Sequence, residues 1–471
     1  MKKIISVSLV LLFLSFSSVS VFGQTKDALY FFKDSPHSTG LNPASVPDNK
    51  FHFYLGFGLS DFRFNTSGFT YHDIINRHPV YADSLRFDIK GLAEKLKDNN
   101  YLNFSYDIDL LGFGFGIGRN YFSYRMYMNM SSRFSFSKGL FDFVLYGTET
   151  PEKKLALMDG KLMDVNGYIA HSVSYGREIN DKLKVGASIK YLNGLINVKT
   201  EKADMGLDYS NEDKITANGS VDILTSNVFG SISISSLFDS NSNYSFTSES
   251  FADIVSNAVD NKGLAFDLGA SYKLNDKMEL SVSILDLGFI NWKSNNTRIR
   301  NKNSSNTVTF GGIETSIDSI GTGLETHFNN FMDSLSTALD LESVTQGSYT
   351  AALPTEFHFG YSWNFHSFNH LHALLSTKLW NSRFVDTRLS VLYALHTKYV
   401  SLSIGNTFSS NAWFNPSALL NLKFGANVYL GCSFNSSSTS FNIADMSGFN
   451  LVTGISFAFG TNKQKKKENI E

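Results

Sequence analysis

Phe122-Ser123-Tyr124-Arg125-Met126-Tyr127-Met128-Asn129-Met130 is the stretch of the chain that decides the fold. Its even positions are apolar or aromatic, its odd positions are mostly polar, and the split continues through Arg133, Phe134 and Phe136. A period of two puts successive side chains on opposite faces of a β-strand. The run is longer than a typical strand of a soluble protein, and one face suits lipid while the other suits a wet interior. We therefore predict a membrane-spanning strand.

The same alternation recurs along the chain and predicts about fourteen strands. It is clear in residues 355–365 and again in residues 449–460. Phase slips at Leu110-Leu111 and Leu285-Asp286 indicate β-bulges. The predicted strands span residues 51–65, 102–118, 121–137, 163–179, 183–200, 263–274, 278–294, 355–365, 369–381, 384–398, 399–409, 416–425, 427–437 and 449–460.

The connections between these strands sort by length. Those after the even-numbered strands are tight turns, such as Arg119-Asn120 and Asn180-Asp181. The long connections follow odd-numbered strands, near residues 66–101, 138–162, 201–262 and 295–354. An up-and-down barrel produces this parity when short turns face the periplasm and long loops face outside, whereas a β-helix or a propeller does not. The prediction is an all-β fold, an antiparallel transmembrane β-barrel over residues 51–460.

The composition is consistent with such a barrel. Of 471 residues, 14% are aromatic and only 18% are charged, which is unusual for a soluble protein and ordinary for a barrel in lipid. Beyond the N-terminal run, no stretch approaches the ~20 apolar residues that a spanning helix needs. The formal net charge of −2 gives no long-range attraction for nucleic acid. The single cysteine, Cys432, excludes an intramolecular disulfide.

Residues 1–23 are predicted to be a signal peptide. Lys2 and Lys3 form its charged start, an apolar run with interspersed serines follows, and Val21-Phe22-Gly23 offers a cleavage site before Gln24. A transmembrane anchor is disfavoured because the run is short and rich in serine. The predicted location is the outer membrane of a Gram-negative cell. Residues 461–471 are predicted to be a basic periplasmic tail, either solvated or in contact with anionic lipid heads.

Residues 24–50 precede the first strand, contain three prolines and show no sustained alternation. We predict that they form an N-terminal hatch, or plug, inside the barrel lumen. Asn42-Pro43-Ala44 is expected to set a turn in the hatch, because proline fixes φ and lacks an N–H donor. Four glycines share one face of a predicted strand and are expected to form a bare wall facing the hatch: Gly112, Gly114, Gly116 and Gly118. Their spacing is not the G-x-G-x-x-G of a dinucleotide-binding loop.

The long extracellular loops are predicted to carry short helices. Leu324, Phe328 and Phe331 recur at helical spacing within Thr322–Ser343, which predicts an amphipathic helix over the extracellular mouth. These three side chains are candidates to line the entry of a hydrophobic ligand. Lys214–Ser226 alternates weakly and is expected to extend a hairpin above the membrane.

No catalytic residue, metal site or cofactor is predicted. His366, His370 and His372 cluster, but no cysteine or carboxylate adjoins them to complete a metal site. The nucleophile motif G-x-S-x-G is absent from the sequence, and nothing marks an interior Ser–His pair like that of a barrel phospholipase. The inward charges are mixed in sign and are expected to pair across the lumen, with a substrate path as the alternative. They are Arg125, Arg133, Lys184, Lys190, Asp267, Lys273, Glu356, Asp386 and Arg388.

Several motifs resemble a known superfamily. Asn42-Pro43-Ala44 in an N-terminal hatch resembles the hatch motif of the FadL-like long-chain fatty-acid transporters, which are barrels of the same predicted strand number. Residues 263–272 and Asp286-Leu287-Gly288 resemble paired strands of that superfamily, which includes the PorV-like barrels of type IX secretion. The resemblance is greatest to a related group of outer-membrane proteins of unknown function. No individual fatty-acid-binding residue is matched.

The resemblance implies one function, and two alternative functions remain. It implies an outer-membrane channel for the passive uptake of small hydrophobic molecules, surrounded by outer-membrane lipid. The alternative is a non-transporting docking barrel that holds a secreted client protein at the cell surface, as PorV-like barrels do, and a structural barrel without a client is the third hypothesis. A deep apolar pocket with a lateral or periplasmic opening favours transport, whereas a sealed lumen with broad, flat loop surfaces favours docking.

Overall fold

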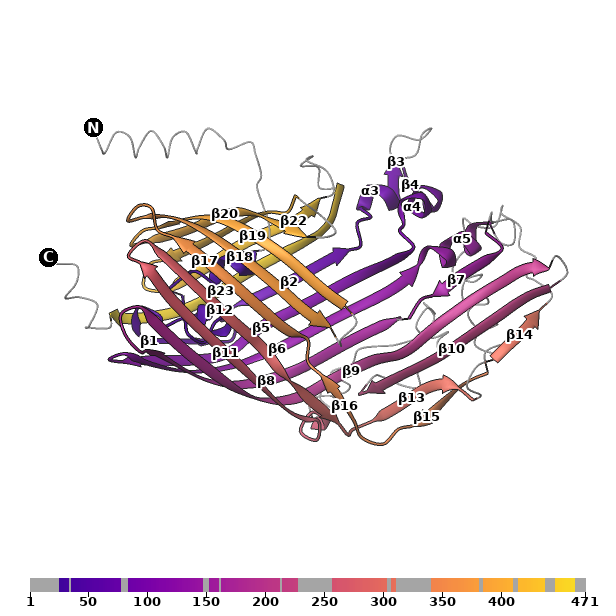
Figure 1. The fold of residues 1–471 in the computed structure, drawn as a ribbon, viewed down its shortest axis with the longest axis horizontal. Helices are drawn as coiled ribbons and strands as arrows, with labels where there is room; N and C mark the ends of the chain where they lie inside the picture. Colours follow the sequence, from indigo (N-terminus) through magenta and orange to yellow (C-terminus); the bar gives the residue numbers. More distant parts are fainter. Residues whose placement is uncertain are drawn as a thin grey trace.

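The chain folds into a closed barrel. The computed structural model describes residues 25–33, 35–77, 84–146, 152–160, 162–211, 214–227, 256–302, 306–310, 340–380, 384–409, 414–436 and 445–461. In these residues, antiparallel strands pair with their neighbours along the chain, and the last strand pairs with the first. Fourteen strand positions thus close into a barrel (Figure 1), which confirms the predicted fold class.

The first strand of the barrel is interrupted. It consists of β1 (Asn49–Leu55) and β2 (Ser60–Thr66), which both lie between β23 (Met446–Thr461) and β5 (Asn99–Ile117). The other barrel strands follow in chain order: β6 (Asn120–Ser137), β8 (Met163–Glu178), β9 (Leu183–Asn211), β11 (Lys262–Asn275), β12 (Met278–Trp292), β16 (Tyr349–Ala352) with β17 (Thr355–Trp363), β18 (Asn369–Trp380), β19 (Phe384–His396), β20 (Val400–Ser409), β21 (Pro416–Lys423) and β22 (Asn427–Ser436).

Both predicted bulges are present. The pairing of β5 with β6 shifts register between Asp109 and Leu111. The pairing of β11 with β12 shifts at Leu285 and Asp286, where Asp286 adopts a left-handed φ of 59°. One end of the barrel carries short turns, such as Gly118-Arg119 between β5 and β6, and the other end carries the long connections. The predicted parity of the loops is therefore confirmed.

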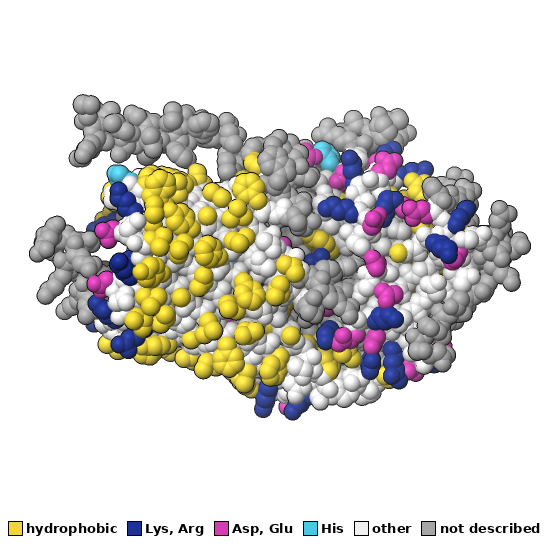
Figure 2. Space-filling model, viewed as in Figure 1, with side chains coloured by type: hydrophobic (Ala, Val, Ile, Leu, Met, Phe, Trp, Pro, Cys, Tyr) yellow, Lys and Arg dark blue, Asp and Glu magenta, His cyan; other side chains and the backbone are white. Residues whose placement is uncertain are grey.

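The outer surface of the barrel is apolar. Along β5, Phe113, Phe115 and Ile117 point outward with 42%, 38% and 62% of their surface exposed, while the alternate positions Gly112 and Gly114 are buried. Figure 2 shows hydrophobic side chains as a broad band over the barrel, with charged side chains gathered beyond both of its borders. This band beside a polar interior is the surface of a membrane-spanning barrel. None of the helices in the described ranges has the length and apolar character needed to cross a membrane.

β9 continues far beyond the barrel. It pairs with β11 as far as Asn193 and then with β10 (Lys214–Ser226), which confirms the predicted hairpin extension. Four further strands join this sheet (Figure 1): β7 (Lys154–Met158), β13 (Asn296–Asn301), β14 (Asn306–Phe310) and β15 (Leu341–Thr345). Leu155, Leu207 and Val221 belong to a buried cluster of the sheet, so this extracellular extension has a core of its own.

Short helices occur in the extracellular loops, as predicted. They are α3 (Tyr71–Ile74), α4 (Ile89–Lys95) and α5 (Lys138–Tyr146), accompanied by a small hairpin of β3 (Ile75–Arg77) and β4 (Leu85–Phe87). Most of the helix predicted in Thr322–Ser343 lies outside the described residues, with Leu324, Phe328 and Phe331. Its last residues, 341–343, form part of β15 instead, because they pair with β13. Residues 1–24 and 462–471, which hold the predicted leader and nearly all of the predicted tail, also lie outside the described residues.

Residues 25–48 lie in the lumen, and we call them the hatch. They include α2 (Thr25–Leu29) and the 3-10 helix η1 (Pro36–Gly40), and their described residues form no strand. Leu29 and Phe32 are fully buried in one cluster with inward side chains of the barrel wall. The wall members of that cluster are Leu59, Leu374, Leu392, Leu419, Tyr429 and Val452.

Candidate functional site

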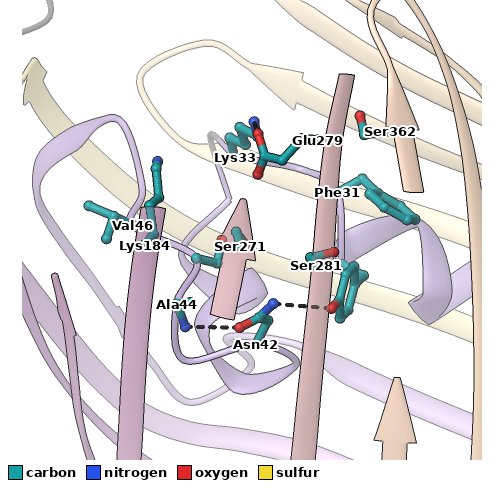
Figure 3. Close-up of a pocket in the computed structure, with 12 residues that line it drawn as sticks. Phe31, Lys33, Asn42, Ala44, Val46, Lys184, Ser271, Glu279, Ser281 and Ser362 are labelled. Carbon is teal, nitrogen blue, oxygen red and sulfur yellow. Dashed lines mark hydrogen bonds and ion pairs between the residues drawn. The ribbon is translucent and has the colours of Figure 1, made fainter. Parts of the chain in front are cut away.

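The turn at Asn42-Pro43-Ala44 is held by the asparagine side chain. Asn42 Oδ1 accepts a hydrogen bond from the Ala44 N–H at 2.9 Å, and the Asn42 carbonyl accepts one from the Ser45 N–H at 2.8 Å. The side-chain amide of Asn42 donates to the Tyr30 hydroxyl at 3.0 Å (Figure 3). Burial raises the pKa of the Tyr30 hydroxyl, which therefore stays neutral. The turn thus ties the end of the hatch to its first half.

Three glycines of the barrel wall receive this turn. Gly176 on β8, Gly186 on β9 and Gly269 on β11 are cross-strand neighbours in one row. A Cβ atom at Gly176 or Gly186 would press against the Pro43 carbonyl, and one at Gly269 would overlap Asn42 Oδ1. Only glycine leaves room for the turn at these positions. We call the three glycines together with the turn the NPA seat.

The four glycines predicted to face the hatch, Gly112, Gly114, Gly116 and Gly118, do not belong to the NPA seat. Gly112, Gly114 and Gly116 are buried and face inward. A Cβ at Gly112 would meet the Tyr54 ring, and one at Gly114 would meet His52, so these glycines accommodate side chains of β1 instead of the hatch. Gly118 does not lie on the wall: it is exposed in the turn after β5, where its left-handed φ of 57° suits a tight reversal.

Tyr54 connects that wall to the hatch. Its ring lies 4.9 Å from the ring of His37, measured between centroids. His37 Nδ1 lies 2.9 Å from the Asp109 carboxylate, and Arg125 donates to the same carboxylate at 2.6 Å. The hatch histidine therefore contacts β5 through the buried Asp109 carboxylate and β1 through the ring of Tyr54.

The first helix of the hatch carries two charges that pair with opposite sides of the wall. Lys26 Nζ lies 2.7 Å from Asp107 on β5 and 3.4 Å from Asp61 on β2. Burial by itself lowers the pKa of Lys26, but the Asp107 and Asp61 carboxylates more than offset burial, and the pKa lies above its ordinary value. The lysine is therefore a permanent cation in the lumen.

Asp27 makes the second ionic contact. It lies 3.3 Å from Arg388 on β19 and accepts a hydrogen bond from the Ser390 hydroxyl at 2.6 Å. Arg388 also donates to Glu356 on β17 at 2.6 Å, so it has two carboxylate partners. Lys190 pairs in turn with Asp267 and Asp286. Several predicted inward charges therefore satisfy one another, as expected from their mixed signs.

An apolar layer lies in the lumen on the extracellular side of the NPA seat. Tyr168, Leu192, Ile290 and Trp292 are buried there in one cluster, and Trp292 is fully buried. The sequence analysis did not identify this layer. The inward positions Ile290 and Trp292 stand out only after the bulge of β12 has shifted the alternation of that strand.

Cavities border the hatch at the periplasmic end of the barrel. One of about 30 Å³ lies beside Lys33, which pairs with Glu279 on β12 at 2.5 Å (Figure 3). It is too small for an organic ligand but large enough for ordered water. Another, of about 260 Å³, is lined by Phe31, Lys33, Asp48, Ser362, Asn364, His370, His372, His396, Thr397 and Lys423. In the described part of the chain, no group of three or more His, Cys, Asp or Glu side chains is arranged to hold a metal ion.

These features define the class of the protein: a membrane-spanning β-barrel whose lumen holds the segment that precedes its first strand. The chain belongs to the Family of unknown function (DUF5723), whose model matches residues 43–433. The predicted resemblance to a group of unknown function is thereby confirmed. No curated protein matches the chain.

The chain is also similar to several solved structures. The toluene transporter TbuX of Ralstonia pickettii shares 10% identity, with 91% of this chain and 95% of that chain covered and a TM-score of 0.45. The Pseudomonas putida toluene transporter TodX shares 10%, with 94% and 98% covered and a TM-score of 0.42. A Pseudomonas aeruginosa FadL homologue shares 11%, with 94% and 99% covered and a TM-score of 0.41.

Proposed function

We propose that this protein is a passive outer-membrane channel for small hydrophobic molecules and that the hatch is its gate. The observation that carries the proposal is the way in which residues 25–48 occupy the lumen. They are held by ion pairs, side-chain hydrogen bonds and the NPA seat, and their described residues take no part in the strand ladder. Contacts of this kind can break and re-form while the hydrogen-bonded barrel stays intact.

The apolar layer supports the proposed class of substrate. Tyr168, Leu192 and Trp292 are packed in a buried apolar layer inside the barrel between the extracellular end and the hatch, and separation of their side chains would present a hydrocarbon surface. Such a surface favours a hydrophobic solute over water. Leu324, Phe328 and Phe331 remain the predicted entry to this layer.

Uptake by whole cells tests the proposal. A strain lacking the protein and the same strain carrying the wild-type chain are given a small aromatic fluorescent probe. We expect faster uptake of the probe by cells with the wild-type chain than by the deletion strain. We expect Asn42→Ala and Pro43→Ala to alter this uptake while the barrel still assembles normally. Equal uptake by the deletion strain, the wild type and both variants would contradict transport.

One observation favours the rival function, the docking of a secreted protein. The sheet of β7, β9, β10, β13, β14 and β15 stands beyond the barrel with its own buried cluster, and a simple channel has no need of it. If docking is the function, the deletion strain loses a surface-displayed protein while uptake of the probe is unchanged. An unchanged set of surface proteins together with reduced uptake favours the channel.

A further inference from the structure

Five inward side chains on one side of the barrel have no hydrogen-bond partner. His372 on β18, Ser403 on β20, Ser417 and Asn421 on β21, and Ser433 on β22 are 0% to 5% exposed. Within the described residues, none of their side-chain nitrogen or oxygen atoms has a protein group at hydrogen-bond distance. Ser417 and Ser433 face each other across β21 and β22. We call these five residues the polar strip.

The hatch covers the polar strip with hydrocarbon. Leu29 and Phe32 pack in one cluster with Leu392 and Leu419, which lie on the same wall as the strip. The ring of Phe31 is stacked on His372, with centroids 4.2 Å apart and an interplanar angle of 8°. The hatch therefore buries the polar groups without replacing their hydrogen bonds to water, which is unfavourable.

On the opposite wall, between β8 and β12, several inward serines are hydrogen-bonded. Ser283 on β12 donates to the Leu41 carbonyl of the hatch at 2.8 Å. Ser174 on β8 and Ser188 on β9 bond each other at 2.8 Å, close to the NPA seat. The three glycines of the NPA seat fit the turn so closely that a methyl group on any of them would displace the turn. The hatch thus fits the β8–β12 wall in shape and bonds to it. On the other side it is held through Asp27, which pairs with Arg388 and Ser390 on β19, but it leaves the polar strip without hydrogen bonds.

We infer that the hatch opens on the β18–β22 side and that the polar strip then lines an aqueous exit to the periplasm. The first part of the hatch moves away from the strip while the NPA seat stays in place. Asp27 must leave Arg388 in this motion, but Arg388 keeps Glu356 at 2.6 Å, so its charge is not left alone. The cavity of about 260 Å³ beside Phe31 and His372 already lies at the periplasmic end of this route.

The inference rests on the proposed function and narrows its substrate class. Serine, asparagine and neutral histidine side chains offer hydrogen bonds without a fixed charge. A permeant on this exit must therefore be small, uncharged and soluble enough to cross in water. Long-chain lipids do not meet that condition, whereas small aromatic or amphiphilic molecules do. A small neutral polyol serves as a probe of the water-lined part of the route.

Cysteine accessibility tests the opening side. In a Cys432→Ser background, Ser403→Cys, Ser417→Cys and Ser433→Cys are treated with methyl methanethiosulfonate, and modification of the purified barrel is followed by intact mass. Ser174→Cys and Ser188→Cys are the matched controls on the opposite wall. We expect the strip cysteines to react about tenfold faster, because local opening uncovers only their side. Equal rates, or faster reaction at the controls, would overturn the inference.

A second variant avoids new cysteines. Asn421→Leu removes two unpaired polar atoms beneath the hatch and should stabilise the closed state. We expect the flux of arabinose, a neutral sugar, into liposomes to fall about fivefold, while assembly, read from heat-dependent gel mobility, stays normal. Unchanged or increased flux would contradict a water-lined exit along the strip.

The two proposals fail in different ways. If aromatic-probe uptake equals that of the deletion strain, the channel itself is refuted. If uptake depends on the protein but the strip cysteines stay as unreactive as the controls, only the exit route is refuted.

Discussion

At the scale of single residues, Gly186 fixes the position of the hatch. Its missing Cβ leaves the space that the Pro43 carbonyl occupies. Gly186→Ala must displace the turn or shift the strand. Overpacking of this kind lowers the stability of the packed state by about 1–3 kcal/mol. We expect a barrel that assembles normally, with a displaced hatch and a higher flux of a neutral solute into liposomes.

Gly347→Ala is the matched control for this glycine. It has open space around its Cβ position, so it should behave as the wild type does. If Gly186→Ala were indistinguishable from Gly347→Ala in both assembly and flux, the seat would not position the hatch.

A second prediction at this scale concerns the charge of Asp27. Asp27→Asn keeps the shape of the side chain but removes the charge that faces Arg388 and Ser390. The loss of these charge-assisted hydrogen bonds destabilises the closed position of the hatch by roughly 1–3 kcal/mol. Arg388 keeps Glu356 as its partner. We expect channel openings in planar bilayers to become about tenfold more frequent. Asp88→Asn, in an extracellular loop, should leave the opening frequency unchanged.

At the scale of elements, the strands could be predicted because their signal is local. Alternation along residues 121–137 shows which side chains face lipid, and the bulge at Leu110-Leu111 appears as a slip in that pattern. The short turns could be predicted for the same reason. The end of the range Thr322–Ser343 shows the limit of this approach, since residues 341–343 follow their partner strand β13 and not helical spacing.

The NPA seat and the polar strip could not be predicted in this way. Gly269 meets Gly176 and Gly186 only through the register of β11 against β9, two strands that are separated in the sequence by β10 and a long connection. The sequence shows a more conspicuous glycine run at residues 112–118, which accommodates side chains of the first strand instead. Ser417 and Asn421 look like ordinary lumen residues until the hatch is placed over them.

The orientation of the elements gives a labelling prediction. Asp204 lies on the part of β9 that extends beyond the barrel, and Asp181 lies in the turn between β8 and β9 at the other end. In a Cys432→Ser background, Asp204→Cys should react with an impermeant thiol reagent on whole cells. Asp181→Cys should react only after the outer membrane is opened. The reverse pattern would mean that the barrel is inserted the other way round.

At the scale of the whole molecule, the lumen is divided into layers. An apolar layer with Trp292 lies toward the extracellular end, charged groups such as Lys26 and Asp107 lie below it, and the hatch lies between the NPA seat and the polar strip. The turn of the hatch fills the NPA seat on one wall, whereas on the other wall the hatch is bonded through Asp27 but leaves the polar strip without hydrogen bonds. A plug with this asymmetry can swing on one side and remain attached on the other, which a plug bonded equally all round cannot do.

The closed barrel itself leads to the last prediction. Every barrel strand has two partners and the last strand pairs with the first, so there is no free edge at which detergent can begin to separate the strands. The apolar band must meanwhile be covered by lipid or detergent. We therefore expect the protein to fractionate with outer membranes, to begin at Gln24, and to migrate differently in SDS gels before and after boiling. Identical mobility of the two samples, or recovery in the soluble periplasmic fraction, would contradict a closed barrel in the outer membrane, because an open sheet unfolds in SDS without heating.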